Sequence, residues 1–108
     1  MYNEQHAEIF RQALADLPDI RERKMFGGLC FMWRGNMLCG VDKDGGMARV
    51  GKDYEAAALE WEGVDPLSFT GRKMGGMVEL TEAALLHEET REAVLSLAKA
   101  FVGSLPAK

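Results

Sequence analysis

Apolar residues recur at helical spacing near both ends of the chain. Between residues 3 and 17 they fall on one side of a helix that Asn3 can cap and Pro18 ends. A second helical pattern runs from residue 88 to residue 104. Shorter helical segments are predicted over residues 52–62 and, from a Thr81 cap, over residues 81–86.

Short apolar segments between these helices predict a sheet. Gly35-Asn36 suits a two-residue hairpin turn, because glycine tolerates the positive φ that such turns require. The order α-β-β-β-α-β-β-α predicts the α+β class, with an antiparallel five-stranded sheet packed on helices in two layers. The length of 108 residues fits a single domain over residues 1–108. The expected strands cover residues 25–33, 37–42, 47–50, 67–70 and 77–80.

The first hairpin is apolar on both faces. With a Gly35-Asn36 turn, Met32 pairs with Cys39 and Trp33 pairs with Leu38. The face expected to pack under the helices carries Leu29, Phe31, Trp33 and Leu38. The opposite, sulfur-rich face carries Cys30, Met32, Met37, Cys39 and Val41.

This second face needs a cover, because an antiparallel sheet with one wet side normally alternates apolar and polar residues. A helix, a partner subunit or a ligand can provide it, and we expect a partner chain, with the protein forming a homodimer. The assignment depends on register. A turn at Arg34-Gly35 would place Cys30 opposite Cys39, and a three-residue loop would put the two thiols on opposite faces.

Composition narrows the class of protein. The formal net charge is −4, with a pI of about 5.2, which argues against direct binding to duplex DNA. The polar first residues indicate no secretory signal, and no apolar run is long enough to span a membrane. Two cysteines make no disulfide framework, so a cytoplasmic location with reduced thiols is expected.

No residue pattern predicts catalysis. Cys30 and Cys39 lack CxxC spacing and a neighbouring histidine, so we interpret them as buried apolar residues rather than a redox pair. His6 and His87 are distant in sequence from both cysteines, which disfavours a metal site. The double glycines match no phosphate-binding motif. The protein is therefore expected to be no enzyme and to bind no cofactor or metal.

Basic residues gather near the expected strand ends. They are interpreted either as ordinary solvated charge or as a patch for an anionic partner. The candidates for such a patch are Arg23, Lys24, Arg49 and Lys73.

Several of these stretches, in this order and spacing, resemble the N-terminal domain of the TfoX/Sxy family over nearly the whole chain. The matching positions are Arg23-Lys24-Met25-Phe26-Gly27-Gly28, Gly35-Asn36-Met37, Arg49-Val50-Gly51, Tyr54, Phe69, Gly71, Lys73 and Met74. The resemblance implies a cytoplasmic bacterial protein with a two-layer α+β fold similar to that of secretion chaperones. Founding members of the family regulate natural competence together with other transcription factors, and they carry a second, helical domain.

We therefore expect a stand-alone domain of this type that acts as a non-enzymatic regulatory or protein-interaction module. The resemblance links it to transcriptional or competence regulation and offers no catalytic residues. The alternative is a small ligand-binding protein or enzyme with a pocket between sheet and helices.

Overall fold

The computed structural model of the protein describes residues 2–25, 27–69 and 72–108, and of residues 68–69 and 72–74 it describes the backbone. Phe26 and Gly71 of the family-like motifs, and Thr70 of an expected strand, lie outside the described residues. The helices are α1 (Glu4–Ala13), α2 (Glu55–Leu59), α3 (Glu82–Leu86) and α4 (Glu88–Gly103). The strands are β1 (Ile20–Met25), β2 (Gly28–Trp33), β3 (Asn36–Val41), β4 (Gly45–Arg49), β5 (Val64–Phe69) and β6 (Arg72–Thr81).

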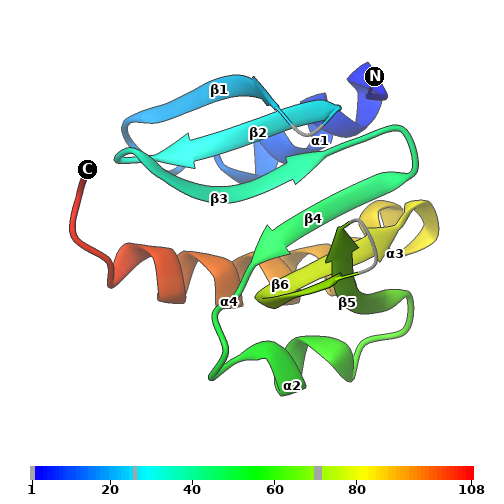
Figure 1. The fold of residues 1–108 in the computed structure, drawn as a ribbon. Coiled ribbons are helices and arrows are strands. Elements are labelled where there is room, and N and C mark those ends of the chain that lie inside the picture. Colours follow the sequence, from blue (N-terminus) through cyan, green and yellow to red (C-terminus); the bar gives the residue numbers. More distant parts are fainter. Residues whose placement is uncertain (1, 26, 70–71) are drawn as a thin grey trace.

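The strands form one antiparallel sheet in the order β1-β2-β3-β4-β6-β5 (Figure 1). The first four follow the chain as hairpins. β6 then lies beside β4, while β5 takes the outer position, so the sheet ends in β1 on one side and β5 on the other. The predicted α+β class is confirmed.

The described helices cover one face of this sheet (Figure 1). A side chain at Gly46 of β4 would meet Phe10 of α1 and Leu85 of α3, each at 3.0 Å. Phe10 also packs on Phe31 of β2, with ring centroids 6.1 Å apart. α2 and α4 add further residues to the same buried core. The helix-covered core therefore lies between the helices and one side of the sheet.

The sheet has six strands, so the predicted count of five is wrong. The missed strand is β1, with the sequence Ile-Arg-Glu-Arg-Lys-Met. It shows no apolar alternation, because it is an edge strand whose charged side chains discourage pairing with another chain. What was expected as one strand over residues 25–33 is the end of β1 followed by β2.

The predicted starts of the helices agree with the structure better than their predicted ends. Asn3 accepts hydrogen bonds from the backbone of Gln5 and His6, and Thr81 accepts one from Ala84. α1 ends at Ala13 rather than at residue 17, and the chain continues in tighter turns in which Ala15 N–H donates to the Gln12 carbonyl and Leu17 N–H to the Leu14 carbonyl. α2 is likewise shorter than the predicted 52–62.

The first hairpin turns at Arg34-Gly35, so the predicted Gly35-Asn36 turn and its register are wrong. Both turn residues have positive φ, 52° and 85°, as a type I′ turn requires. Trp33 then pairs with Asn36. A β-bulge at Leu38 shifts the register further along, so that Phe31 pairs with Cys39 and Cys30 with Gly40.

This bulge overturns two face assignments. Cys39 shares the inner face with Phe31 and belongs to the helix-covered core, together with Leu38. Val41 pairs with the inward Leu29 and also belongs to the core. Leu29, Phe31 and Leu38 lie in the core as predicted, and Trp33 packs against it. The two cysteines therefore lie on opposite faces of the sheet.

The C-terminal residues hold the strained turn in place. The Lys108 amide donates to the Arg34 carbonyl, and the Arg34 guanidinium donates to the Gly103 carbonyl, both at 2.9 Å. Asn36 Nδ2 donates to the Pro106 carbonyl at 2.9 Å. The guanidinium of Arg34 also lies over the Trp33 ring. A non-glycine residue with positive φ is thus supported by tertiary contacts.

Replacing Asn36 with alanine is expected to destabilise the fold by about 1–2 kcal/mol. The amide of Asn36 is buried, so its loss leaves the Pro106 carbonyl without its donor. Chemical denaturation measures the effect. Ser96→Ala, at an exposed position of α4, is the control and should change stability by less than about 0.5 kcal/mol. Equal effects of the two variants would contradict this role of Asn36.

Candidate functional site

The face of the sheet without described helices, here called the outer face, is the candidate site. Side chains of paired residues lie on the same face, so the register identifies its members. Arg21 pairs with Met32 and Arg23 with Cys30, both opposite in orientation to the inward Phe31. By this register the outer face includes Arg21, Arg23, Met25, Cys30, Met32, Met37, Gly40, Met47, Arg49, Met77, Glu79 and Asp65.

The centre of the outer face is sulfur-rich and tightly packed. Cys30, Met47 and Met77 are 0%, 4% and 7% exposed, although they stand outside the helix-covered core. Met32 and Met37 are half-buried and present apolar surface. Two of the predicted interface residues, Met32 and Met37, are thus accessible, whereas Cys30 is buried and Cys39 faces the other way.

One row of the outer face crosses all the strands of the sheet. Its members, in order from β1 to β5, are Arg23, Cys30, Gly40, Met47, Glu79 and Asp65. Gly40 is required at its centre, because a side chain there would lie 2.9 Å from the Leu29 carbonyl oxygen and 3.3 Å from the Cys30 sulfur. The row is therefore basic at one end, apolar in the middle and acidic at the other end.

Both thiols are held in their protonated form. Burial raises the pKa of Cys30. Burial also raises the pKa of Cys39, and the charge of Cys30 adds to that effect. Since the thiolate is the reactive and metal-binding form, a raised pKa opposes both kinds of chemistry. Their positions on opposite faces also keep the two sulfurs from forming a disulfide in this register.

The raised thiol pKa predicts loss of stability in alkali. A thiol whose folded-state pKa lies above its unfolded value stabilises the fold fully below the unfolded pKa, about 8.5, and less as pH rises above it. Above that pH, each buried thiol lowers the free energy of unfolding by up to about 1.4 kcal/mol for each further pH unit. Denaturation of wild type and Cys39→Ala at pH 7 and pH 10 measures this. The variant should show the smaller loss between the two pH values, and an equal loss would refute the prediction.

The predicted basic residues do not converge on one cleft. Arg23 and Lys24 are neighbours on β1, so they extend from opposite faces of the sheet. Lys24 lines a cleft of about 540 Å³ with Tyr2 and Met25. Arg49 lines a different cleft of about 360 Å³ and lies over the Phe101 ring, 5.5 Å from its centroid. The side chain of Lys73 lies outside the described residues.

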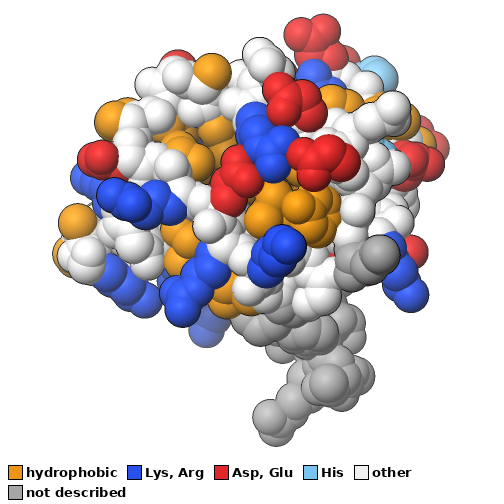
Figure 2. Space-filling model, turned by 90° about the horizontal axis from the view of Figure 1, so that it is seen from above, with side chains coloured by type: hydrophobic (Ala, Val, Ile, Leu, Met, Phe, Trp, Pro, Cys, Tyr) orange, Lys and Arg blue, Asp and Glu red, His pale blue; other side chains and the backbone are white. Residues whose placement is uncertain are grey.

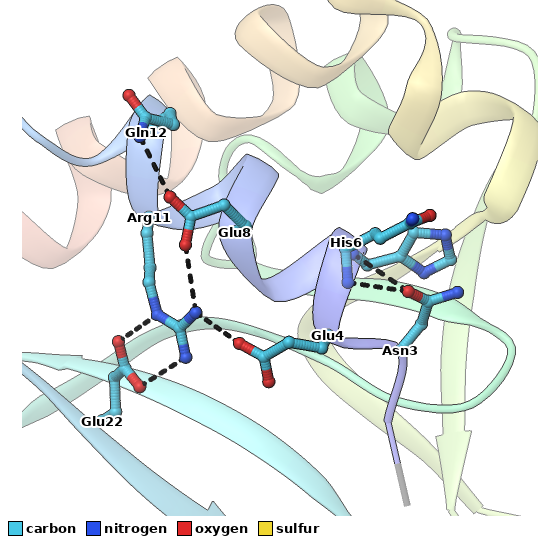
Figure 3. A network of polar contacts seen from close by, with 8 residues as sticks. Asn3, Glu4, His6, Glu8, Arg11, Gln12 and Glu22 are labelled. Carbon is cyan, nitrogen blue, oxygen red and sulfur yellow. Dashed lines mark hydrogen bonds and ion pairs between the residues drawn. The ribbon is translucent and has the colours of Figure 1, made fainter.

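On the helix side of the sheet, Glu22 of β1 takes part in an ion-pair network with Arg11 of α1. Glu22, between the two outward arginines, points inward and accepts hydrogen bonds from Arg11 of α1 at 2.5 and 2.9 Å (Figure 3). Arg11 also contacts Glu4 and Glu8. The Arg11 guanidinium holds the pKa of Glu22 below its usual range. Glu22, the acid between Arg21 and Arg23 in sequence, is therefore paired with Arg11 on the inner face.

The edge of the sheet formed by β1 is basic. Arg21, Arg23 and Lys24 are all exposed on this strand. Seen from that side, Lys and Arg side chains gather over part of the surface, with apolar side chains showing between them (Figure 2). Sequence analysis found Arg23 but missed Arg21 as a site residue. It also missed Met47, Met77, Glu79 and Asp65, because their place depends on the β4–β6 and β5–β6 pairings.

The histidines have structural partners. His6 is buried and its Nε2 lies 2.9 Å from Glu82 of α3, while His87 caps α4 through Thr90. Across the described ranges, no group of three or more His, Cys, Asp or Glu side chains could hold a metal ion. The same ranges contain no helix with the length and apolarity needed to cross a membrane.

Comparison with known proteins gives one match. No curated protein and no solved structure matches the chain. The family model of the TfoX N-terminal domain matches residues 12–101, which span β1 to β6 and most of α4. That range includes the whole outer face but only the last two residues of α1, Gln12 and Ala13. The chain therefore belongs to the TfoX N-terminal domain family.

Proposed function

We propose that the protein is a non-enzymatic regulatory module that binds protein through its outer face and self-associates there. The observation that carries this proposal is the one-sided placement of the helices, which leaves an apolar, methionine-bearing sheet face without a described helix over it. Methionine surfaces repack easily against different contacts, which suits an interaction surface. The acidic pI and the buried, protonated thiols support neither DNA binding nor catalysis as the main role.

The proposal also covers where the protein works and in how many domains it folds. Residues 1–108 form a single domain that works in the bacterial cytoplasm, where free thiols stay reduced. The resemblance to regulators of competence supports a role in transcriptional regulation that is exerted through protein partners rather than through direct contact with DNA. No cofactor takes part.

Light scattering over a concentration series tests the proposal with Met32→Glu as the disrupting variant. Wild type should increase in mean mass with concentration, while Met32→Glu should stay monomeric and folded. Ser96→Glu adds the same charge on an exposed position of α4 and should behave like wild type. If Met32→Glu associates as wild type does, the outer face is not the contact surface.

The runner-up is a small ligand-binding protein or enzyme. The observation that favours it is the cleft lined by Arg49, Lys52 and Phe101, where two cations and an aromatic ring meet. A thermal-shift screen with nucleotides, acyl phosphates and metal ions tests this alternative. Ligand at about a hundred times its dissociation constant would stabilise the fold by roughly 2.7 kcal/mol. A shift that Arg49→Ala removes would favour the binding protein over the interaction module.

A further inference from the structure

The central row of the outer face is self-complementary in charge. Its central row begins with Arg23 on β1 and ends with Glu79 on β6 and Asp65 on β5, with Gly40 on β3 between them. Five interstrand spacings separate the ends of the row, which makes it about 24 Å long. A surface that is basic at one end and acidic at the other can satisfy both ends with a reversed copy of itself.

These charges have no partners within the described part of the chain. Arg21, Arg23, Asp65 and Glu79 make no ion pair with any described residue. Glu22 is occupied by Arg11 on the opposite face. Glu79 stands among like charges, and burial together with the charge of Asp65 raises its pKa. A cation brought over Glu79 would therefore relieve repulsion as well as form an ion pair.

We propose that two copies of this chain pack outer face to outer face about a two-fold axis that runs along β3 over Gly40. This inference rests on the proposed function and specifies its partner and geometry. Such an axis reverses the row, so Arg23 of one copy lies over Glu79 of the other and Cys30 lies over Met47. The two Gly40 residues meet at the axis, where the absence of side chains allows the closest approach. Met37, also on β3, approaches its counterpart.

Other pairings of two copies fit the charges less well. An axis along the row would place Arg23 over Arg23, a like-charge contact that costs binding energy. Pairing through sheet edges is opposed at β1 by its run of charged residues. At β5 it is opposed by Pro66 and by the irregular register between Pro66 and Ser68. Face-to-face packing with near-aligned strands is an ordinary arrangement for two sheets.

A charge-exchange experiment tests the geometry. Arg23→Glu makes both ends of the row acidic, and Glu79→Arg makes both ends basic. Each variant alone should have its dimer dissociation constant raised roughly tenfold or more. An equimolar mixture of the two should form heterodimers about as well as wild type dimerises, because every contact in the mixed pair again joins opposite charges. Analytical ultracentrifugation measures all three samples, and circular dichroism confirms that each variant is folded.

The outcomes separate the geometry from the proposed function. If both single variants dimerise as wild type does, or if the mixture stays monomeric, the two-fold arrangement is wrong. Loss of association in Met32→Glu would still support the outer face as the contact surface in that case. If wild type is monomeric at high concentration, both the proposed self-association and the two-fold arrangement are refuted. Capture of a partner by wild type but not by Met32→Glu would then keep the interaction module.

Discussion

Replacing Phe31 with alanine is expected to destabilise the protein by about 3–5 kcal/mol, a large part of the stability of so small a domain. Phe31 is fully buried in the helix-covered core and packs on Phe10 of α1. Its loss removes apolar contacts and leaves a cavity between sheet and helix. Chemical denaturation gives the unfolding free energy, and a domain left largely unfolded in water is also consistent with this estimate.

Met32→Ala is the matched control for this change. Met32 follows Phe31 on β2 but lies half-buried on the outer face. A monomer should lose little stability from its truncation, so measurements are made at low protein concentration. If Met32→Ala destabilises the monomer as much as Phe31→Ala does, the assignment of the two faces is reversed.

Glutamate at two neighbouring positions of β3 should have opposite consequences. Leu38 is fully buried in the core, so Leu38→Glu would bury an unpaired carboxylate and cost several kcal/mol, enough to unfold the domain. Met37 lies on the outer face, paired with Met32, so Met37→Glu should stay folded. In the two-fold arrangement it would also bring two like charges together and abolish association.

Thermal unfolding and ultracentrifugation of the two variants measure these outcomes. A folded Leu38→Glu or an unfolded Met37→Glu would show that the bulge at Leu38 does not place these side chains as described. Because alternation along a regular strand would set residues 37 and 38 on opposite faces anyway, the informative comparison extends to Cys39. Cys39→Glu should also unfold the domain, since the bulge keeps both Leu38 and Cys39 inward.

The proposed interaction through the outer face would account for features that the helix-covered core does not explain. The sheet contains methionines that no described helix covers. β1 carries two arginines on either side of Glu22, which pairs with Arg11 of α1. Among the described residues of one copy, Arg21 and Arg23 make no ion pair, and Met32 and Met37 remain half-buried. A reversed second copy would give Arg23 an acidic partner in Glu79 and would cover the half-buried Met32 and Met37 at the same time.

The sequence by itself determined the local structure. Helical periodicity located α1 and α4, and short polar side chains at Asn3 and Thr81 marked two helix starts, because such signals act within a few residues. The apolar hairpin and the order of elements were enough for the α+β class. The apolar character of both hairpin faces, which points to the candidate site, was also visible in the sequence alone.

Tertiary structure decided the register of the strands, the edge strand β1 and the row of charges across the sheet. β1 has no apolar alternation, so its pairing with β2 is what identifies it as a strand. The hydrogen bonds between Glu22 and Arg11 then tie this strand to α1. The turn at Arg34-Gly35 depends on C-terminal residues about seventy positions away, which supply hydrogen bonds that offset its positive φ. The bulge at Leu38 then moved Cys39 into the core. The row from Arg23 to Asp65 exists only because β6 lies beside β4, a long-range pairing that no local pattern encodes.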